Sequence, residues 1–217
     1  QRRRHVFTYV GGGAGSKIYK SIDGGKNWRE LKSGLPSATK GRIGMDISPS
    51  NPDFLYALVE AENNQKGLYF SNNRGESWKK VNKYVTSGNY YQEVFCDPKD
   101  PKKVFFMDTW LHHTTDGGKT VVKTGEKSKH VDNHCIWINP NDTDHWIVGC
   151  DGGLYETWDH ANNWHYKPNL PITQFYKVAV DNDFPFYNIY GGTQDNNSLG
   201  GPSRTITNHG IMNSDWY

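Results

Sequence analysis

Four copies of one eight-residue pattern recur along this chain at nearly even intervals. The pattern is Ser or Thr, any residue, Asp or Asn, any residue, Gly, two further residues, and Trp. Its third position falls at Asp23, Asn73, Asp116 and Asp159, so that successive copies begin 50, 43 and 43 residues apart. A repeat of about 40–50 residues indicates a modular fold in which each unit packs on its neighbours.

The residue types in this pattern suit a tight turn. Asp or Asn accepts backbone N–H groups, Gly supplies a positive φ, and the trailing Trp packs between sheets. The third copy has Val121 in place of Trp, and the fourth has Ala161 in place of Gly. We therefore expect structural, not catalytic, roles for the following residues: Ser21, Asp23, Gly25, Trp28, Ser71, Asn73, Gly75, Trp78, Asp116, Gly118, Asp159 and Trp164.

A second pattern keeps the same interval. It consists of an apolar strand, a turn rich in Pro, Asn and Asp, and another apolar strand, with markers at Pro49, Pro98, Pro140 and Asn182. Together the patterns divide each repeat into four short strands, and no segment has a helical apolar period. The sequence therefore predicts an all-β fold, a segment of a β-propeller built from four-stranded antiparallel blades.

We expect one partial propeller over residues 1–217, with about four to five blades and an incomplete ring. The predicted whole blades span 42–84, 91–125 and 133–170, and the partial blades span 5–35 and 174–217, the last ending after its second strand. An open arc would leave sheet edges unpaired. The chain is thus expected to be a segment of a longer polypeptide, or to be completed by partner chains.

Composition excludes several classes of function. The formal net charge is +2, with Lys and Arg spread along the chain, which does not favour nucleic acid as a partner. No apolar run approaches the roughly 20 residues of a membrane helix, and this segment shows no signal peptide. It also lacks a phosphate-binding loop, a dinucleotide fingerprint and a Cys-x-x-Cys motif, so no cofactor is predicted.

Two of the three cysteines lie in a predicted hairpin. A turn at 141–144 would place Cys135 opposite Cys150, where a cross-strand disulfide is geometrically conceivable. The alternative is two small buried apolar residues. The sequence leaves both possibilities open.

The repeated turns, preceded by Lys-Ile-Tyr at 17–19 or Gly-Leu-Tyr at 67–69, resemble the BNR/Asp-box repeats of sialidases, xyloglucan-type glycoside hydrolases and the sortilin (Vps10) luminal domain. The C-terminal half, through 151–155 and 191–198, is similar to exported bacterial BNR proteins described as sortilin-like or glycosyl-hydrolase-like. The resemblance implies a propeller that is secreted, periplasmic or on the cell surface. A sialidase is not expected, because arginines are too few to grip a substrate carboxylate.

The face opposite the repeated turns receives the second-to-third loops and the links between blades, and we call it the linker face. In the related enzymes it holds the active cleft. We expect it to bind a ligand through Tyr90, Tyr91, Trp110, His130, His134, Gln174, Tyr176 and Gln194. A glycosidase needs two carboxyl groups, and the candidates for them on this face are Asp108, Asp132, Asp151 and Asp195. The alternative for Asp151 is a hairpin turn, and for Asp195 a polar loop.

An alternation of His130, Asp132 and His134 would place three side chains on one side of a strand, as metal ligands could be. Because no remote fourth ligand accompanies them, we predict no metal site. The sequence favours an exported propeller that binds a glycan, a peptide or other protein chains, or acts as a scaffold. The alternatives are a glycoside hydrolase that uses paired aspartates, and a structural spacer in a larger assembly. Whether the chain is an enzyme is left open.

Overall fold

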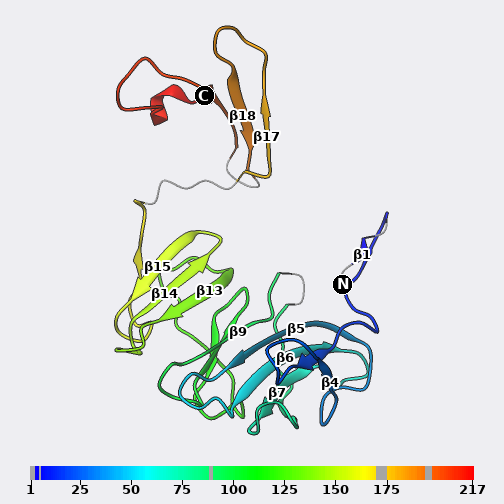
Figure 1. The fold of residues 1–217 in the computed structure, drawn as a ribbon. Coiled ribbons are helices and arrows are strands. Elements are labelled where there is room, and N and C mark those ends of the chain that lie inside the picture. The colour runs from blue at the N-terminus through cyan, green and yellow to red at the C-terminus, as the bar shows by residue number, and fades with distance from the viewer. Residues whose placement is uncertain (1–2, 5, 88–89, 170–174, 194–196) are drawn as a thin grey trace. The chain divides into compact units, whose positions relative to one another are not determined.

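A computed structural model describes residues 3–4, 6–87, 90–169, 175–193 and 197–217. The chain divides into two compact units, Gln1–Pro168 and Asn169–Tyr217, and each is described by itself. Within the described residues, strands are joined by turns, and the one helical element is the short 3-10 turn η1 (Asn213–Asp215) (Figure 1). None of the described helical residues forms a segment long and apolar enough to cross a membrane.

The first unit is a succession of small antiparallel sheets. Two of them have two strands each, β1 (Arg3–Arg4) with β2 (Tyr9–Val10), and β3 (Ile18–Lys20) with β4 (Arg29–Leu31). Three sheets of four strands follow, each with its strands in sequence order. Their strands are β5 (Lys40–Ile47), β6 (Leu55–Ala61), β7 (Gly67–Ser71) and β8 (Lys79–Asn82); β9 (Glu93–Cys96), β10 (Val104–Met107), β11 (His112–Thr114) and β12 (Val122–Lys123); and β13 (Asn133–Ile138), β14 (Trp146–Cys150), β15 (Gly153–Thr157) and β16 (His165–Tyr166).

Strand β6 shows why these sheets stack. All five residues from Leu55 to Val59 are buried, although side chains alternate between the two faces of a strand. Leu55, Ala57 and Val59 join a core shared with Ile18 of β3, whereas Tyr56 and Leu58 join a second core shared with β9 and β10. The sheet is therefore covered on both faces, by the sheet before it and the sheet after it.

Strand β10 repeats this arrangement one sheet further along. Val104 and Phe106 face the core shared with β6, and Phe105 and Met107 face a third core with Trp146 of β14. Each fully buried apolar side chain of this size contributes roughly 1.5–3 kcal/mol to stability. Apolar cores that lie between successive four-stranded sheets are the packing of propeller blades. The predicted all-β propeller segment is thus confirmed.

The repeated turns, at 21–28, 71–78, 114–121 and 157–164, each join the third strand to the fourth strand of a sheet, or β3 to β4. In the third turn, Asp116 Oδ1 accepts hydrogen bonds from Thr120 N and from Thr114 Oγ1, both at 2.9 Å. Gly118 N donates to Thr114 Oγ1 at 3.0 Å. The same three kinds of bond occur in the other turns.

The tryptophans of the turns differ in burial. Trp78 is 5% exposed, because it packs in the core shared with β3 and β4, whereas Trp28 is 63% exposed. The indole N–H of each donates to the carbonyl of its own turn glycine, but Trp164 instead donates to Gly125 O of the preceding repeat, at 2.9 Å. We propose that the repeated turns are structural in all four copies.

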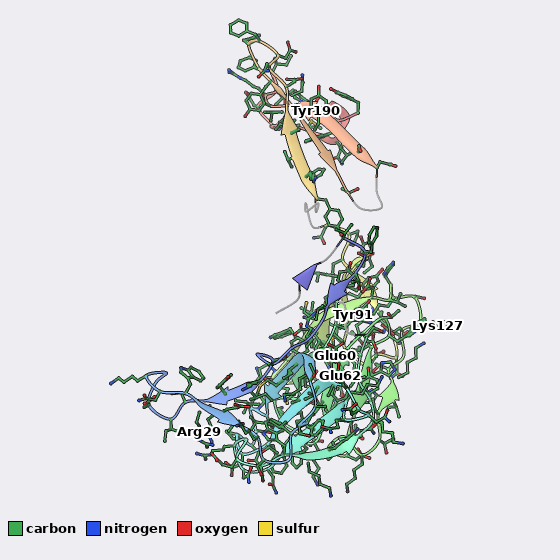
Figure 2. The ribbon with its side chains drawn as sticks, turned by 90° about the vertical axis from the view of Figure 1, so that its right-hand side faces the viewer. Arg29, Glu60, Glu62, Tyr91, Lys127 and Tyr190 are labelled. Carbon is green, nitrogen blue, oxygen red and sulfur yellow. The ribbon has the colours of Figure 1, made fainter. Side chains whose placement is uncertain are left out.

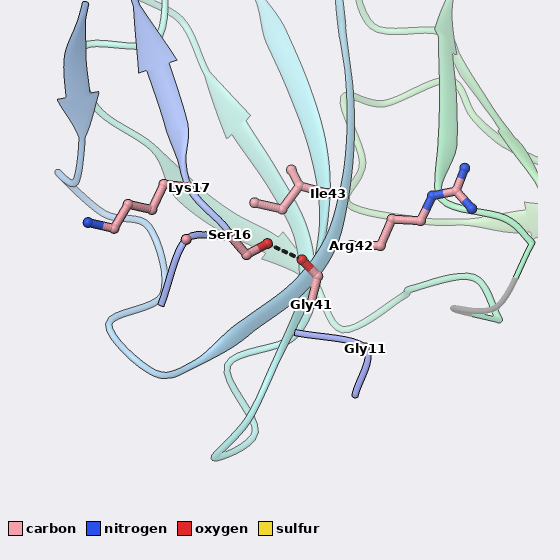
Figure 3. A pocket seen from close by; sticks show the side chains of 7 residues that line it. Gly11, Ser16, Lys17, Gly41, Arg42 and Ile43 are labelled. Carbon is pink, nitrogen blue, oxygen red and sulfur yellow. Dashed lines mark hydrogen bonds between the residues drawn. The ribbon is translucent and has the colours of Figure 1, made fainter. Parts of the chain in front are cut away.

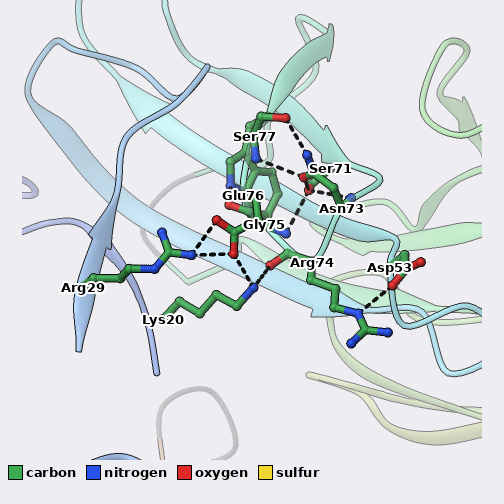
Figure 4. A network of polar contacts seen from close by, with 10 residues as sticks. Lys20, Arg29, Asp53, Ser71, Asn73, Arg74, Gly75, Glu76 and Ser77 are labelled. Atoms are coloured by element: carbon green, nitrogen blue, oxygen red, sulfur yellow. Dashed lines mark hydrogen bonds and ion pairs between the residues drawn. The ribbon is translucent and has the colours of Figure 1, made fainter. Parts of the chain in front are cut away.

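Ion pairs of the second turn reach both the sheet before it, through Glu76, and another turn of its own sheet, through Arg74 (Figure 4). Glu76 accepts from Lys20 Nζ at 2.7 Å and from Arg29 Nη2 at 2.5 Å, while Arg74 Nε donates to Asp53 Oδ1 at 2.6 Å. All are partly exposed, and ion pairs that are open to solvent contribute little to stability. Apolar packing, not this network, holds the two sheets together.

The second unit is a three-stranded antiparallel sheet of β17 (Lys177–Val180), β18 (Asn188–Gly192) and β19 (Ser198–Pro202). The expectation that the last blade ends after two strands is therefore wrong. Strand β19 contains Gly200 and Gly201, and aromatic rings cover both glycines, Tyr217 against Gly200 and Trp216 against Gly201. Tyr217 also exchanges two backbone hydrogen bonds with Gly200, at 2.8 and 2.9 Å.

Neither reading of the cysteine pair holds. Cys135 pairs with Gly149, and Asn133 pairs with Cys150, because the register shifts between Asn133 and Cys135. All three cysteines are free, and Cys135 is exposed rather than buried. An irregularity of one residue moves a side chain out of line with its expected partner.

Candidate functional site

The linker face carries a polar cluster where the β9–β12 and β13–β16 sheets meet. In an antiparallel sheet, the first strand begins and the second strand ends at the same end of the sheet. The described parts of the links, 83–87, 90–92 and 124–132, therefore reach this end of the sheets together with the loop after β10. They bring Tyr91, Asp132 and His134 into contact, three residues that the sequence nominates for this face.

Asp132 lies at the centre of the Tyr91–Asp132–His134 cluster. Its Oδ1 accepts a hydrogen bond from the Tyr91 hydroxyl, and His134 Nε2 lies 3.1 Å from the same oxygen, within ion-pair distance. The rings of Tyr91 and His134 stack, with centroids 5.6 Å apart and planes 21° apart. Among the described residues, Asp132 Oδ2 accepts no hydrogen bond, and the carboxylate is about one-third exposed.

The backbone around Asp132 is held in an uncommon conformation, with φ at 66°. Asp132 N donates to Thr109 O at 2.8 Å, Asn133 N donates to Asp108 O at 3.0 Å, and Asp151 N donates to Asp132 O at 3.0 Å. Three of the nominated aspartates, 108, 132 and 151, thus lie on segments that are hydrogen-bonded to one another. Asp151 belongs to the two-residue turn between β14 and β15, as its alternative reading expects.

Tyr91 is buried and neutral. Burial and the hydrogen bond to the Asp132 carboxylate raise the pKa of Tyr91 to about 12. Its hydroxyl therefore serves as a donor at physiological pH, and Thr109 Oγ1 lies 3.5 Å from it. Asp108 Oδ1 accepts from Thr109 N at 2.8 Å, which leaves its other oxygen without a partner among the described residues.

Two exposed aromatic residues adjoin this region in the chain, Tyr90 next to Tyr91 and Trp110 next to Thr109. Tyr90 is 70% exposed and meets Tyr91 edge to face at 6.5 Å, and Trp110 is 43% exposed. Lys123 Nζ lies 3.1 Å from the centre of the Trp110 ring, a cation–π contact. Glu60 and Glu62, at the end of β6, lie at the same end of the sheets as Tyr91 (Figure 2).

The remaining nominated residues are not brought into this cluster. His130 is exposed, and its Nδ1 lies 2.8 Å from Val131 O. Tyr176 is exposed in the second unit, whose placement relative to the first is not described. Gln174, Gln194 and Asp195 lie outside the described residues.

The alternation of His130, Asp132 and His134 does not form one face of a strand. Strand β13 begins only at Asn133, and the left-handed φ of Asp132 breaks the extended run. The part of the chain that the structure describes contains no group of three or more His, Cys, Asp or Glu residues that could hold a metal ion.

Sequence reasoning missed a polar network beneath the cluster. Glu126 and Lys129 form an ion pair at 3.0 Å, with 2% and 0% of their side chains exposed. The segment 125–130 has the composition of a solvated link, and no sequence signal marks these charges as buried. Their burial is decided by Trp164 and Tyr155 of the following sheet, whose rings lie near the ammonium group.

An open hollow of about 590 Å³ lies elsewhere in the first unit (Figure 3). It is lined by Gly11, Gly15, Ser16, Lys17, Gly41, Arg42 and Ile43. Lys17 pairs with Glu30 at 2.9 Å, and Arg42 pairs with Glu93. Because both cations already have carboxylate partners, we assign no function to this hollow.

Comparison with known proteins identifies the family. The family model Sortilin-Vps10, described as "Sortilin, neurotensin receptor 3", matches residues 2–114. Sortilin of Rattus norvegicus is 27% identical over 192 residues, and sortilin of Mus musculus is 26% identical over 199 residues. These alignments cover 80% and 82% of this chain but 20% and 21% of the relatives, so that the chain spans about a fifth of their length.

Solved structures support the fold. The GH74 enzyme of Niastella koreensis has a TM-score of 0.51 at 16% identity, covering 80% of this chain and 29% of that one. An ancestral GH74 enzyme has a TM-score of 0.53 at 13% identity, covering 93% and 28%. At these identities the likeness concerns the propeller architecture alone. Since the family model matches more than half of its residues, the chain belongs to the Sortilin-Vps10 family.

Proposed function

We propose that this chain is part of an exported, ligand-binding β-propeller, and that its ligand contacts the linker face at the Tyr91–Asp132–His134 cluster. The observation that carries the proposal is the cluster itself. Three side chains from two links and one strand meet there, around a carboxylate that keeps one oxygen free among the described residues. Membership in a family whose description names a receptor supports ligand binding and an exported location.

The cluster suits a polar ligand with a flat or apolar side. Asp132 Oδ2 can accept a charge-assisted hydrogen bond from a hydroxyl, amide or amine. The exposed rings of Tyr90 and Trp110 can pack against a sugar ring or a peptide side chain. We therefore propose a peptide or glycan ligand, with other protein chains as partners that extend the propeller.

A second candidate function, glycoside hydrolysis, is favoured by one observation. Asp108, Asp132 and Asp151 lie on hydrogen-bonded segments, and a glycosidase needs two carboxyl groups about 5–10 Å apart. In that case one aspartate would act as acid and another as base or nucleophile. Asp132→Asn and Asp151→Asn separate the two functions, because they should abolish hydrolysis only if these aspartates are catalytic.

The test is a binding and turnover screen with the 217-residue chain. Isotope-labelled protein is titrated with xyloglucan and β-glucan oligomers and with extended peptides, and NMR shifts report which residues respond. We expect a bound ligand to shift the signals of Tyr91 and His134. Asp132→Asn should weaken binding by at least about tenfold, because a charged acceptor contributes roughly 1.5–3 kcal/mol.

The matched control is Asp53→Asn, since Asp53 is an exposed carboxylate with a cationic partner on the side of the repeated turns. This change should leave affinity unaltered. Equal binding by the Asp132→Asn variant would refute the proposed site. Hydrolysis of the oligomers that is abolished by Asp132→Asn or Asp151→Asn would establish the enzyme instead.

A further inference from the structure

The buried pair of Glu126 and Lys129 uses every donor of its ammonium group. Besides Glu126 Oε1, Lys129 Nζ donates to His130 O at 2.8 Å and to Asn133 Oδ1. The rings of Trp164 and Tyr155 lie 5.3 and 5.8 Å from it, within the range of cation–π attraction. An ammonium group has three N–H bonds, so that this one is fully satisfied.

The carboxylate of Glu126 connects the pair to a different segment. Its Oε2 accepts from Leu111 N at 3.0 Å, and its Oε1 also accepts from Asn133 Nδ2 at 2.9 Å. Asn133 is itself fully buried, and its Nδ2 lies 3.2 Å from Asp108 O. The pair therefore joins the loop after β10, the link 124–132 and the start of β13.

Burial of this pair has little value as a source of stability. The desolvation of two charges offsets much of their attraction, and a well-packed apolar replacement is often equally stable or more stable. The network instead fixes the positions of the segments that it joins. Asp108, Asp132 and His134 lie on the three segments that it joins, whereas Glu126 and Lys129 are too buried to contact a ligand themselves.

We propose that Glu126 and Lys129 are positioning residues that hold Asp132 and His134 against Tyr91. The hydrogen bonds of this network then maintain the left-handed φ of Asp132, and Asp132 Oδ2 is oriented before a ligand binds. The inference rests on the proposed function for its purpose, but its test needs no ligand. The two can therefore fail separately.

The test compares Lys129→Met, Glu126→Gln and the double variant with the unaltered chain. The readouts are the NMR signals of the His134 ring and the hydrogen exchange of the Asp132 and Asp151 amides. We expect the His134 signals to shift and both amides to exchange at least about tenfold faster, while amides of β6 keep their rates. The double variant leaves no unpaired charge in the core, so it remains informative where Lys129→Met does not fold.

A second ion pair in the same pair of sheets provides the control. Lys103 and Asp97 lie 3.3 Å apart with side chains 9% and 0% exposed, at the end of the sheets that carries the repeated turns. Lys103→Met should lower stability but leave the His134 signals unchanged. The proposal is overturned if the folded double variant retains the His134 signals and the amide protection, if Lys103→Met shifts them equally, or if the double variant does not fold, since the network would then serve the core.

Discussion

Replacement of Asp116 tests whether the repeated turns are structural. In Asp116→Ala, the backbone N–H of Thr120 and the hydroxyl of Thr114 lose a charged acceptor that lies 2.9 Å from each. A buried hydrogen bond to a charged group contributes about 1.5–3 kcal/mol, and one exposed to solvent contributes less. We expect the free energy of unfolding to fall by about 2 kcal/mol, with Asp116→Asn losing only about 0.5 kcal/mol.

The smaller loss for Asn has a precedent in the chain itself. In the second turn, Asn73 Oδ1 accepts from Ser77 N at 3.0 Å and from Ser71 Oγ at 2.9 Å, as Asp116 does in the third. The amide oxygen therefore makes the same bonds without a charge. The comparison of Asp with Asn at one position removes the charge at nearly constant side-chain volume, whereas Ala removes the acceptor as well.

Both variants should also differ from the unaltered chain in their response to acid, because neither Ala nor Asn carries the carboxyl group of Asp116. The hydrogen bond from the Thr120 backbone lowers the pKa of Asp116. Stability contributed by such a group is present above its unfolded pKa and is lost as the pH falls through its folded pKa. Asp116→Asn should remove this part of the acid dependence while retaining most of the stability at neutral pH.

Urea unfolding followed by tryptophan fluorescence measures both effects, provided that the slope of the transition stays constant among variants. Our reasoning would be refuted by equal losses in Asp116→Ala and Asp116→Asn. It would also be refuted if Asp116→Ala cost less than about 0.5 kcal/mol, since the turn would then hold its shape without the acceptor.

Two further changes test the packing between sheets. Gly44→Ala should lower the free energy of unfolding in urea by about 3 kcal/mol, because the added Cβ would lie 1.3 Å from Gln92 O. The control Gly15→Ala, with open space around the added Cβ, should leave stability nearly unchanged. Equal losses in the two variants would contradict the close approach at Gly44. Burial, followed by the charges of His160 and Lys103, lowers the pKa of His113 to about 4 from an ordinary 6.5. Its stabilisation is present above pH 6.5 and is lost as the pH falls to 4, by roughly 2 kcal/mol after allowance for partial exposure, so that unfolding of His113→Gln should depend less on pH in that range.

The sequence alone determined the fold class and the position of the turns. The bonds that define a repeated turn join residues no more than four apart, as between Thr114 and Gly118. Such short-range geometry is set by residue type, and the patterns therefore predicted four-stranded sheets and the connections that lie opposite the linker face. The family resemblance was correct for the same reason, since it rested on those turns.

Burial and register were decided by the tertiary structure. Trp28 and Trp78 occupy the same place in their turns, but only Trp78 has a sheet beside it to pack against. The irregularity between Asn133 and Cys135 shifted the predicted pairing by one residue, which counting along a hairpin cannot reveal. In the second unit, aromatic cover turned a glycine-rich segment into the strand β19.

The candidate site was predicted in part. The sequence nominated Tyr91, Asp132 and His134 for one face, and in the structure the three residues lie together. Their contacts depend on the packing of two sheets, since Tyr91 and Asp132 are 41 residues apart in the sequence. The pair of Glu126 and Lys129 has the sequence of a solvated link and becomes a core element only because the next sheet encloses it. Local chemistry specifies the turns of this protein, whereas the environment of a charge exists only after the sheets have packed.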